Sequence, residues 1–398
     1  MTSTRLNELA AIYRDGLLSD TIPFWQKHAP DRECGGFLTF LDADGSVVST
    51  DKPIWIAGRI TWLFSTLYNE VERREDWLEL ARHGIDFLRR HAFDADGRMF
   101  YSVTRDGRPL RKRRYIFSEA FGVIAFAEYS KAANDAAARQ TAIDLYRLIL
   151  RYLNTPGLLE PKFRPETRQL KSQAIPMILL AISQVLRQVD ASPAYEDVIG
   201  RSITEVVEHF RKLEFKALLE NVGPGGEFLD EPMGRLINPG HSIETAWFIL
   251  EEARHRRDRR LLDLGLQILD WSLEIGWDDK YGGIYYFRDA KGKPCEAYEH
   301  DMKLWWPHNE AIYATLLAHA LTGEDRYEQW HARIHDWAYA HFPDRVHGEW
   351  FGYLRRDGSV SSTLKGNMWK GPFHLPRMQL NCWKLLEQMR GDPASLRI

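Results

Sequence analysis

A repeated segment with a period near 60 residues constrains the fold of this chain more than any other feature. Short glycine-marked, aromatic-rich segments recur along the 398 residues, and the intervals between their markers are 62, 60, 68, 57 and 66 residues. The markers are Gly35, Gly97, Gly157, Gly225, Gly282 and Gly348. A fixed period of this kind indicates one supersecondary unit copied along the chain, so it is read before any domain count from length.

Each repeat combines a strand-like segment with two helical segments. Alternating aromatic residues precede Asp-Gly or Lys-Gly pairs, as at Asp106-Gly107 and Asp357-Gly358, and such patterns are typical of short hairpins. Between the markers, the apolar residues follow the helical period. The predicted helices cover 5–28, 54–67, 77–88, 116–132, 136–153, 171–189, 193–213, 240–255, 258–275, 303–322, 325–342 and 372–390.

The helices of each pair differ in character. Those that begin near 52, 116, 171, 240, 303 and 372 are apolar on nearly all sides, as buried inner helices are, whereas their successors carry charge-rich faces. Six such hairpins predict an all-α fold, an (α/α)6 barrel with short β-hairpins in the connecting loops. We expect one catalytic domain over residues 1–398. An open α-solenoid is the competing architecture, but solenoid repeats are shorter, at about 20–45 residues.

Composition and charge exclude several classes of function. The net charge is −3, and the longest uninterrupted basic run is Arg111-Lys112-Arg113-Arg114, which is typical of a solvated turn, so no nucleic acid is expected as a partner. No apolar stretch is long enough to span a membrane, and residues 1–13 lack a signal-peptide core. The three cysteines cannot form a disulfide framework. We therefore expect a cytoplasmic protein.

Unusual polar residues gather at the starts of the predicted inner helices. Asn238 is a predicted N-cap, Pro239 takes the first helical position, and His241 falls in the first turn. The positive end of the helix dipole favours a neutral imidazole there, which is the form a general base needs. Glu244 lies three residues on, on the same face. The competing interpretation is a capping histidine beside a solvated glutamate.

Two further inner helices begin in the same way. Pro372 starts the last helix, and His374 falls in its first turn. A third start pairs Trp305 and Trp306 with the carboxylate of Glu310. Adjacent tryptophans are often core residues, but together with the proline and the carboxylate they also suit a sugar-binding wall.

An arginine lies inside another apolar helix. Arg59 follows Trp55 in the segment near 54–67, and arginine is rarely buried without a partner. It either anchors a structural carboxylate or holds an anionic oxygen of a ligand. Glu119, at the start of the next inner helix, is a candidate partner for Arg59.

Other chemistries have less support. His241, Glu244, Glu310 and His374 offer metal-ligating atoms, but no H-E-x-x-H or comparable spacing is present, so no metal is expected. No P-loop and no G-x-S-x-G elbow occurs. A glycoside hydrolase needs two carboxylates across a cleft. Glu244 and Glu310 supply such a pair, so an (α/α)6-barrel glycosidase stays open as an alternative.

At these residues the chain resembles the N-acylglucosamine 2-epimerase (renin-binding protein) family over nearly its whole length. The most specific stretches are Leu219-Glu220-Asn221-Val222, Asn238-Pro239-Gly240-His241-Ser242-Ile243-Glu244, Met302-Lys303-Leu304-Trp305-Trp306-Pro307-His308-Asn309-Glu310, Gly348-Glu349-Trp350-Phe351-Gly352-Tyr353 and Phe373-His374-Leu375-Pro376-Arg377. The resemblance implies the same barrel and the interconversion of N-acetyl-D-glucosamine and N-acetyl-D-mannosamine. The open-chain sugar would lose and regain the C2 proton through an enediolate.

The resemblance also implies the roles of individual residues. It places the catalytic histidines on His241 and His374, the essential arginine on Arg59 and the essential glutamate on Glu310. The residues expected to bind the sugar are Glu244, Trp305, Trp306, Asn309, Arg377, Glu119 and Trp55. No cofactor is required for the chemistry, whereas activation by ATP and a homodimer are typical of the family.

Two relatives of this activity stay open at the sequence level. An aldose–ketose isomerase uses the same enediolate but protonates C1. A 2-epimerase for an unacylated sugar, such as mannose, glucose or cellobiose, shares the barrel. The motif Asn238-Pro239-Gly240 before the first histidine differs from that of the cellobiose and mannose enzymes, which points toward the acylated amino sugar.

Overall fold

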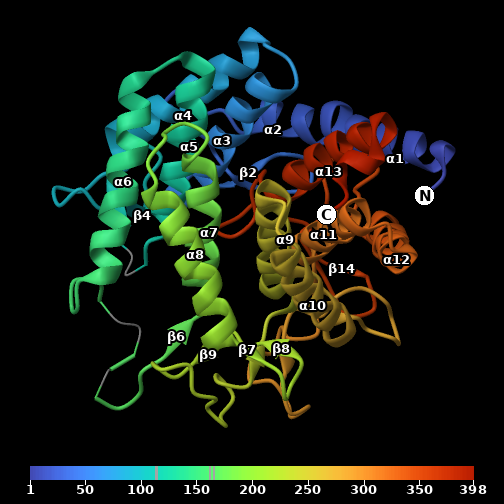
Figure 1. Cartoon of the computed structure of the whole chain (residues 1–398). Helices are drawn as coiled ribbons and strands as arrows, with labels where there is room; N and C mark the ends of the chain where they lie inside the picture. The colour runs from blue at the N-terminus through green and yellow to red at the C-terminus, as the bar shows by residue number, and fades with distance from the viewer. Residues whose placement is uncertain (113–114, 161–162, 165) are drawn as a thin grey trace.

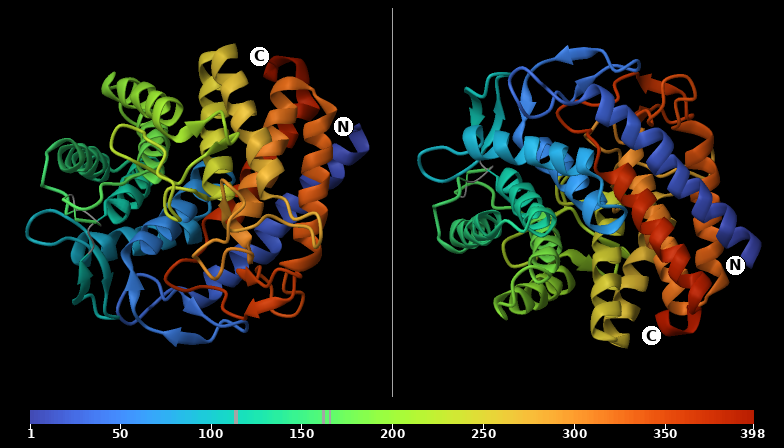
Figure 2. Two further views of the ribbon diagram at one scale, coloured as in Figure 1. Left: turned by 90° about the horizontal axis from the view of Figure 1, so that it is seen from below. Right: turned by 90° about the horizontal axis from the view of Figure 1, so that it is seen from above.

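The computed structural model describes residues 1–112, 115–160, 163–164 and 166–398. Each of the twelve predicted helices is present in this part of the chain (Figure 1). Of the basic run at 111–114, Arg113 and Arg114 lie outside the described residues. Both chain ends lie on the side of the molecule formed by α1, α12 and α13 (Figures 1 and 2).

Six helices form the inner ring and their partners the outer one. The inner helices are α3 (Ile54–Glu70), α5 (Phe117–Ala133), α7 (Ala174–Leu186), α9 (Pro239–Arg256), α11 (Trp305–Thr322) and α13 (His374–Gly391). The outer helices are α1 (Ser3–Asp15), α4 (Glu75–His91), α6 (Ala136–Asn154), α8 (Ala194–Glu205), α10 (Arg259–Gly276) and α12 (Asp325–His341), with the short α2 (Ile22–His28) and α14 (Pro393–Leu396). The assignment of inner and outer helices from apolar pattern is confirmed.

Burial follows this division. All residues of α11 from Trp305 to Leu321 are buried, and so are those of α5 from Ser118 to Ser130. The ring closes where Phe373, just before α13, packs edge-on against Trp62 of α3 at 5.2 Å between centroids. A closed ring is incompatible with the open α-solenoid considered as an alternative.

Two predicted helices are interrupted by π-helical turns. The segment 5–28 runs as α1, a π-helical turn over Gly16–Thr21, and α2. Pro23 at the start of α2 has no amide hydrogen to donate to the preceding turn, which removes one α-helical bond at that point. The segment 193–213 likewise continues from α8 into a π-helical turn, Val206–Phe210.

Short strands tie the repeats together at one end of the barrel. Three predicted hairpins occur, namely β1 (Phe40–Leu41) with β2 (Val47–Ser49), β4 (Phe100–Val103) with β5 (Pro109–Lys112), and β13 (Tyr353–Leu354) with β14 (Val360–Ser362). A further hairpin, β7 (Arg211–Lys212) with β8 (Ala217–Leu218), was not predicted. The strands that lead into inner helices are β3 (Lys52–Pro53), β6 (Lys171–Ser172), β10 (Leu236–Ile237) and β12 (Lys303–Leu304).

Each of these leading strands pairs with a strand from a later loop. β3 pairs with β4, β6 with β9 (Asn221–Val222), β10 with β11 (Arg288–Asp289), and β12 with β13. The pairing holds the starts of the inner helices together at one end. Polar residues in those first turns are therefore directed to a common place.

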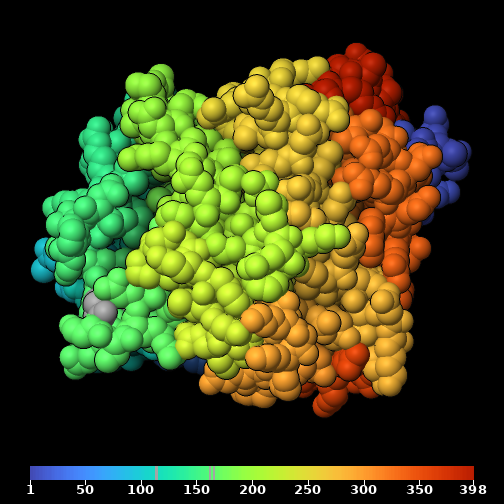
Figure 3. Space-filling view, turned by 60° about the horizontal axis from the view of Figure 1, so that its bottom comes forward, coloured from blue at the N-terminus to red at the C-terminus, as the bar shows by residue number. Residues whose placement is uncertain are grey.

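The middle of the chain covers one face of the barrel. In the space-filling view, the green and yellow-green segments spread over the centre of this face and adjoin the gold segments of α9 and α10 (Figure 3). Among the helices of the described residues, none combines the length and apolar character that crossing a bilayer requires.

Candidate active site

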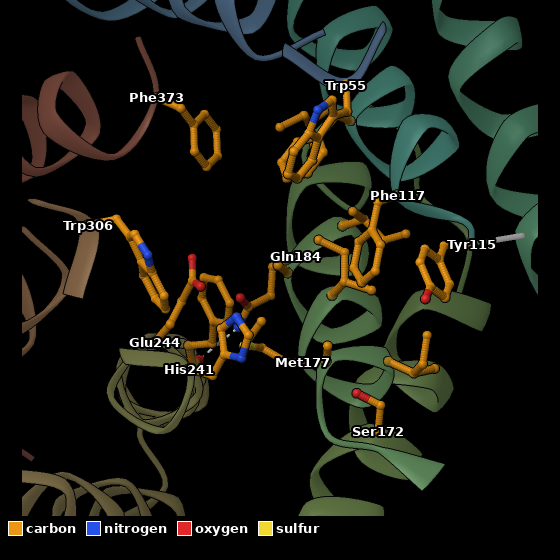
Figure 4. A pocket seen from close by; sticks show the side chains of 18 of the residues that line it. Trp55, Tyr115, Phe117, Ser172, Met177, Gln184, His241, Glu244, Trp306 and Phe373 are labelled. Carbon is orange, nitrogen blue, oxygen red and sulfur yellow. Dashed lines mark hydrogen bonds between the residues drawn. The ribbon is translucent and has the colours of Figure 1, made fainter. Parts of the chain in front are cut away.

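A cavity of about 1970 Å³ lies inside the barrel and reaches the end where the inner helices begin. The first turns of α9, α11 and α13 contribute His241, Trp306 and His374 to its wall. Glu244 and Trp306 lie on the same side of the cavity as His241, and Phe117 and Ser172 lie across from them (Figure 4).

His241 is placed by the predicted helix cap. The side chain of Asn238 accepts a hydrogen bond from the His241 amide at 3.2 Å, and Pro239 opens the helix. The imidazole Nδ1 lies 2.9 Å from the Glu220 carboxylate. Burial opposes the charged form, but the nearby carboxylates, Glu220 first, outweigh it and raise the His241 pKa above its ordinary value. The carboxylates around His241 thus favour its protonated form and act against the neutral form that the helix dipole was predicted to favour.

His374 has the opposite preference. Its Nδ1 lies 2.7 Å from Oε1 of Glu310, so the proton on that nitrogen is directed at the carboxylate and Nε2 carries the free lone pair. Burial, followed by the positive charge of Arg59, holds the pKa of His374 well below its usual range. This imidazole is neutral at pH 7.

The two imidazoles meet at one tryptophan. The ring centroid of Trp306 lies 5.1 Å from that of His241 and 5.6 Å from that of His374. Both histidines also line the same cavity. Residues 133 positions apart in the sequence, 241 and 374, are thus brought to one cavity, one favouring the protonated form and the other the neutral form.

Glu310 stands behind His374. It is 2% exposed and does not line the cavity. Its Oε1 faces His374 and accepts from Arg377, and its Oε2 accepts a hydrogen bond from Trp247 Nε1 at 2.7 Å. These partners use both carboxylate oxygens, so Glu310 can orient His374 but does not reach a ligand.

Arg377 joins the two candidate carboxylates. Its Nη2 donates to Glu244 at 2.6 Å and to Glu310 at 2.7 Å. Ligand atoms of Glu244, Glu310 and His374 lie within 4.8 Å of one another, a spacing that suits a metal ion, but the guanidinium already supplies a positive charge to both carboxylates. A glycosidase would need both carboxylates to face the substrate, and only Glu244 lines the cavity.

Arg59 is a buried cation held by aromatic rings. Its guanidinium carbon lies 4.6, 4.1 and 4.8 Å from the ring centroids of Trp55, Phe121 and Phe373. It is 7% exposed, lines the cavity, and its Nε has no hydrogen-bond partner among the described residues. Burial lowers the Arg59 pKa to about 9, which leaves it charged at pH 7. Its charge is available to an anionic oxygen in the cavity.

Two residues predicted to bind the sugar lie elsewhere. Glu119 does not line the cavity and is not the partner of Arg59, because Arg98 donates to it at 2.5 Å and the Met99 amide at 2.9 Å. Asn309 is fully buried within α11 and does not line the cavity either. The remaining predicted ligands are cavity-lining residues, namely Trp55, Glu244, Trp305, Trp306 and Arg377.

Sequence reasoning did not assign Glu220 and Trp247 to the site. Glu220 lies in a loop just before β9, and only its place in a family-like motif singled it out. Trp247 lies six residues after His241 on α9 and shares the buried face of that helix. Its indole fits the ordinary pattern of a core residue, so no local signal marked its bond to Glu310.

Comparisons with known proteins identify one enzyme family. The family model described as N-acylglucosamine 2-epimerase (GlcNAc 2-epimerase) matches residues 35–374. The N-acylglucosamine 2-epimerase of Bos taurus is 36% identical over 397 residues, with 95% of this chain and 92% of that protein covered. That of Mus musculus is 34% identical over 393 residues, with 95% and 93% covered.

The fold also matches solved structures. The cellobiose 2-epimerase from Bacillus thermoamylovorans B4167 superposes with a TM-score of 0.83 at 23% identity, with 97% of this chain and 100% of that chain covered. Likeness at that identity concerns the fold alone. It confirms the (α/α)6 barrel predicted from the repeat.

Proposed function

Because the chain belongs to the N-acylglucosamine 2-epimerase family, we propose that it interconverts N-acetyl-D-glucosamine and N-acetyl-D-mannosamine by moving the proton at C2 of the open-chain sugar. The chain is an isomerase of the carbohydrate epimerase type. The choice of an acylated amino sugar is supported by the relatives of that name, which are more similar in sequence than the cellobiose 2-epimerase is.

One observation carries the mechanism: two imidazoles with opposite protonation preferences face one cavity beside Trp306. Inversion at a carbon requires removal of a proton from one face and its return to the other. A neutral His374 suits the base and a protonated His241 suits the acid. In the reverse direction the two histidines exchange these roles.

The proton transfer leaves charge on the sugar oxygen. His374 Nε2 takes the C2 proton, the C–H electron pair forms the C1–C2 double bond, and the carbonyl electrons move to O1. Since C2 of an N-acyl sugar carries nitrogen, the intermediate is an enolate rather than the enediolate of an unacylated sugar. Arg59 is the cation placed to hold O1, and its dry aromatic surroundings strengthen that interaction. His241 then donates its proton to the opposite face of C2.

The remaining residues position these groups. Glu310 and Trp247 hold the tautomer and orientation of His374, and Glu220 does the same for His241. Glu244 lines the cavity and is available to a sugar hydroxyl. Glu310 is therefore proposed as a positioning residue rather than a catalytic one.

Several broader properties belong to the same proposal. The chemistry above uses only side chains of this chain, so no cofactor or metal is required. We treat residues 1–398 as one catalytic domain, because the site draws on α3, α9, α11 and α13. Activation by ATP and a homodimer, which the family resemblance implies, belong to the proposal, and so does the cytoplasmic location expected from the sequence.

The test is turnover of N-acetylmannosamine followed by proton NMR. The proposal predicts that N-acetylglucosamine appears, that no ketose signal does, and that mannose and cellobiose are turned over with lower kcat/KM. His374→Asn should lower kcat by about 10²–10⁴. A ketose product would favour the isomerase alternative, and faster turnover of an unacylated sugar would contradict the substrate assignment.

A further inference from the structure

The cavity is much longer than a monosaccharide requires. His241 in the first turn of α9 and His255 in its last turn both line it. At 1.5 Å per residue, the cavity runs about 21 Å along that helix. Its volume of about 1970 Å³ also exceeds the roughly 300–1,000 Å³ usual for small-molecule sites.

Both ends of this cavity reach solvent. Tyr298 and Trp369, which are 92% and 52% exposed, line it at the end that holds the histidine pair. Gln188 and His255, both exposed, line it at the opposite end of the barrel. The cavity is therefore a channel through the barrel, with the catalytic histidines at one end only.

The middle of the channel is an apolar wall supplied by α7. We call this part the α7 gallery and define it by the cavity-lining residues Ile175, Ile178, Ala181, Ile182 and Val185. None of these side chains carries a hydrogen-bonding group. Phe248 of α9 lines the same stretch of the cavity.

α7 and α9 share an apolar cluster through Met177 and Leu180, and a polar contact joins the two helices on either side of it. Gln173, just before α7, donates to Thr245 Oγ1 at 2.6 Å. Three turns later, Gln184 donates to the Phe248 carbonyl oxygen at 3.0 Å. Between these two contacts, Ala181 is only partly buried, although inner helices such as α11 are buried along almost their whole length. Ile178 and Ile182, which are 8% and 0% exposed, pack within the apolar cluster of α3 to α6. Ile175, Ala181 and Val185 are only partly buried, so the open part of the cavity wall is centred on these three residues.

The stereochemistry at C2 directs one substituent toward this wall. When C2 is planar, two bases above and below it leave its three substituents, C1, C3 and the amide nitrogen, to depart in the plane between them. Arg59, the cation proposed to hold O1, comes from α3. In Figure 4, Gln184 of α7 is drawn beside Glu244 of α9, and Phe117 and Ser172 lie on the opposite side from Trp306.

Taking the proposed function as its basis, we propose that the α7 gallery is a subsite for the acyl chain on the sugar nitrogen and admits linear chains well beyond acetyl. N-butanoyl and N-hexanoyl mannosamines would extend along Ile178 and Ala181 toward Val185. Each methylene that leaves water for this wall tightens binding by up to about fourfold. An acetyl group alone leaves most of the gallery empty.

The first experiment compares acyl-chain length in the wild-type enzyme. N-acetyl-, N-butanoyl- and N-hexanoylmannosamine are assayed for C2 epimerisation by NMR. The expected result is turnover of all three, with KM falling by up to about fourfold per added methylene. Turnover of the N-acetyl sugar with rejection of both longer chains would overturn the subsite.

Two variants test how far the acyl chain extends along the gallery. Ala181→Phe fills its middle, and Val185→Trp fills it one helical turn further on, about 6 Å away. Ala181→Phe should keep N-acetyl turnover within about twofold while both longer substrates lose at least tenfold in kcat/KM. Val185→Trp should spare N-butanoyl and impair N-hexanoyl. Ala137→Phe, on the exposed side of α6, is the matched control and should change nothing. Equal losses at every chain length would contradict the proposal.

Failure of the proposed function is distinguishable from failure of the subsite. If the wild type turns over none of the three sugars, the epimerase assignment fails. Calorimetric titration with N-acetyl- and N-hexanoylmannosamine then decides the gallery. Tighter binding of the hexanoyl sugar, lost in Ala181→Phe, supports it, whereas equal affinities or no binding at all overturns it.

Discussion

At the level of single residues, the two histidines differ in the charged groups that surround their imidazole rings. Glu220 faces His241, and its charge raises the His241 pKa, whereas burial and Arg59 lower that of His374. In the proposed mechanism these preferences supply one acid and one base, which is the state a two-base inversion starts from.

This asymmetry predicts a bell-shaped dependence of kcat/KM on pH. Activity is lost as the pH falls through the lowered pKa of His374, because the base becomes protonated, and it is lost as the pH rises through the raised pKa of His241, because the acid loses its proton. Glu220→Gln removes the charge that raises the latter pKa, so the alkaline limb should move to lower pH while the acid limb stays.

The control for that profile is Glu299→Gln. Glu299 lines the same cavity but is not among the groups that shift the pKa of either histidine. Its variant should keep the wild-type profile. An unchanged alkaline limb in Glu220→Gln would show that His241 is not the titrating acid.

The site residues that could be predicted from the sequence are those marked by a pattern of neighbouring residues. His241 and His374 were predicted because a cap, a proline and a first-turn histidine form a local pattern. The predicted pairing of Glu119 with Arg59 was wrong, because Glu119 pairs with Arg98 instead. A pairing between separate segments produces no pattern in the local sequence. The contact of Glu220 with His241 was not predicted for the same reason.

At the level of elements, a buried lysine recurs in several repeats. Each lysine precedes an inner helix or follows a hairpin, and it pairs with an aspartate at the start of a glycine-marked turn. The pairs are Lys52 with Asp31 at 2.8 Å, Lys303 with Asp278 at 3.1 Å, and Lys365 with Asp344 at 2.9 Å. The same lysines also donate to turn carbonyls, namely those of Gly35, Gly283 and Gly348. The same buried lysine–aspartate pair therefore stabilises at least three of the repeats.

Removing one such lysine should destabilise the fold strongly. Lys52 is 1% exposed and also donates to the carbonyl of Arg105. Lys52→Met leaves the buried Asp31 carboxylate and two carbonyl groups short of a donor, which should lower the free energy of unfolding by about 3 kcal/mol. Urea unfolding followed by circular dichroism measures this.

The matched control is Arg108→Met in the neighbouring hairpin. Arg108 pairs with Asp106, but both side chains are exposed to solvent. Exposed ion pairs contribute little, so the urea midpoint should stay where it is. A similar loss in both variants would mean that burial of the lysine pair is not what matters.

The helices were predictable from sequence because the apolar period is local and because inner and outer helices differ in their charged faces. The lysine pairs were not, since each joins residues from separate strands and turns. The π-helical turn before Pro23 was missed because an apolar period cannot distinguish α-helical from π-helical hydrogen bonding.

At the level of the whole molecule, two apolar clusters share the barrel. One is centred on α9 to α12 and the other on α3 to α6, and α7 and α13 contribute residues to both. Leu180 and Ile182 of α7, for example, belong to different clusters. Because α7 and α13 pack into both clusters, we expect neither cluster to unfold without the other. Such coupling is what a single domain requires.

One domain predicts one cooperative unfolding transition. Urea unfolding followed by far-ultraviolet circular dichroism and by tryptophan fluorescence should give coincident curves, because tryptophans such as Trp77 and Trp277 lie in different clusters. Two separated transitions would mean that the halves of the barrel unfold independently.

Two imidazoles that flank C2 and act on opposite faces leave a distinct isotope pattern when N-acetylmannosamine is epimerised in D₂O. Proton NMR reads the isotope at C2 of substrate and product early in the reaction. We expect a product almost fully deuterated at C2 and a remaining substrate that keeps its protium. A product that retains the substrate's own hydrogen would show that a single base serves both faces, and the two-histidine mechanism would then be wrong.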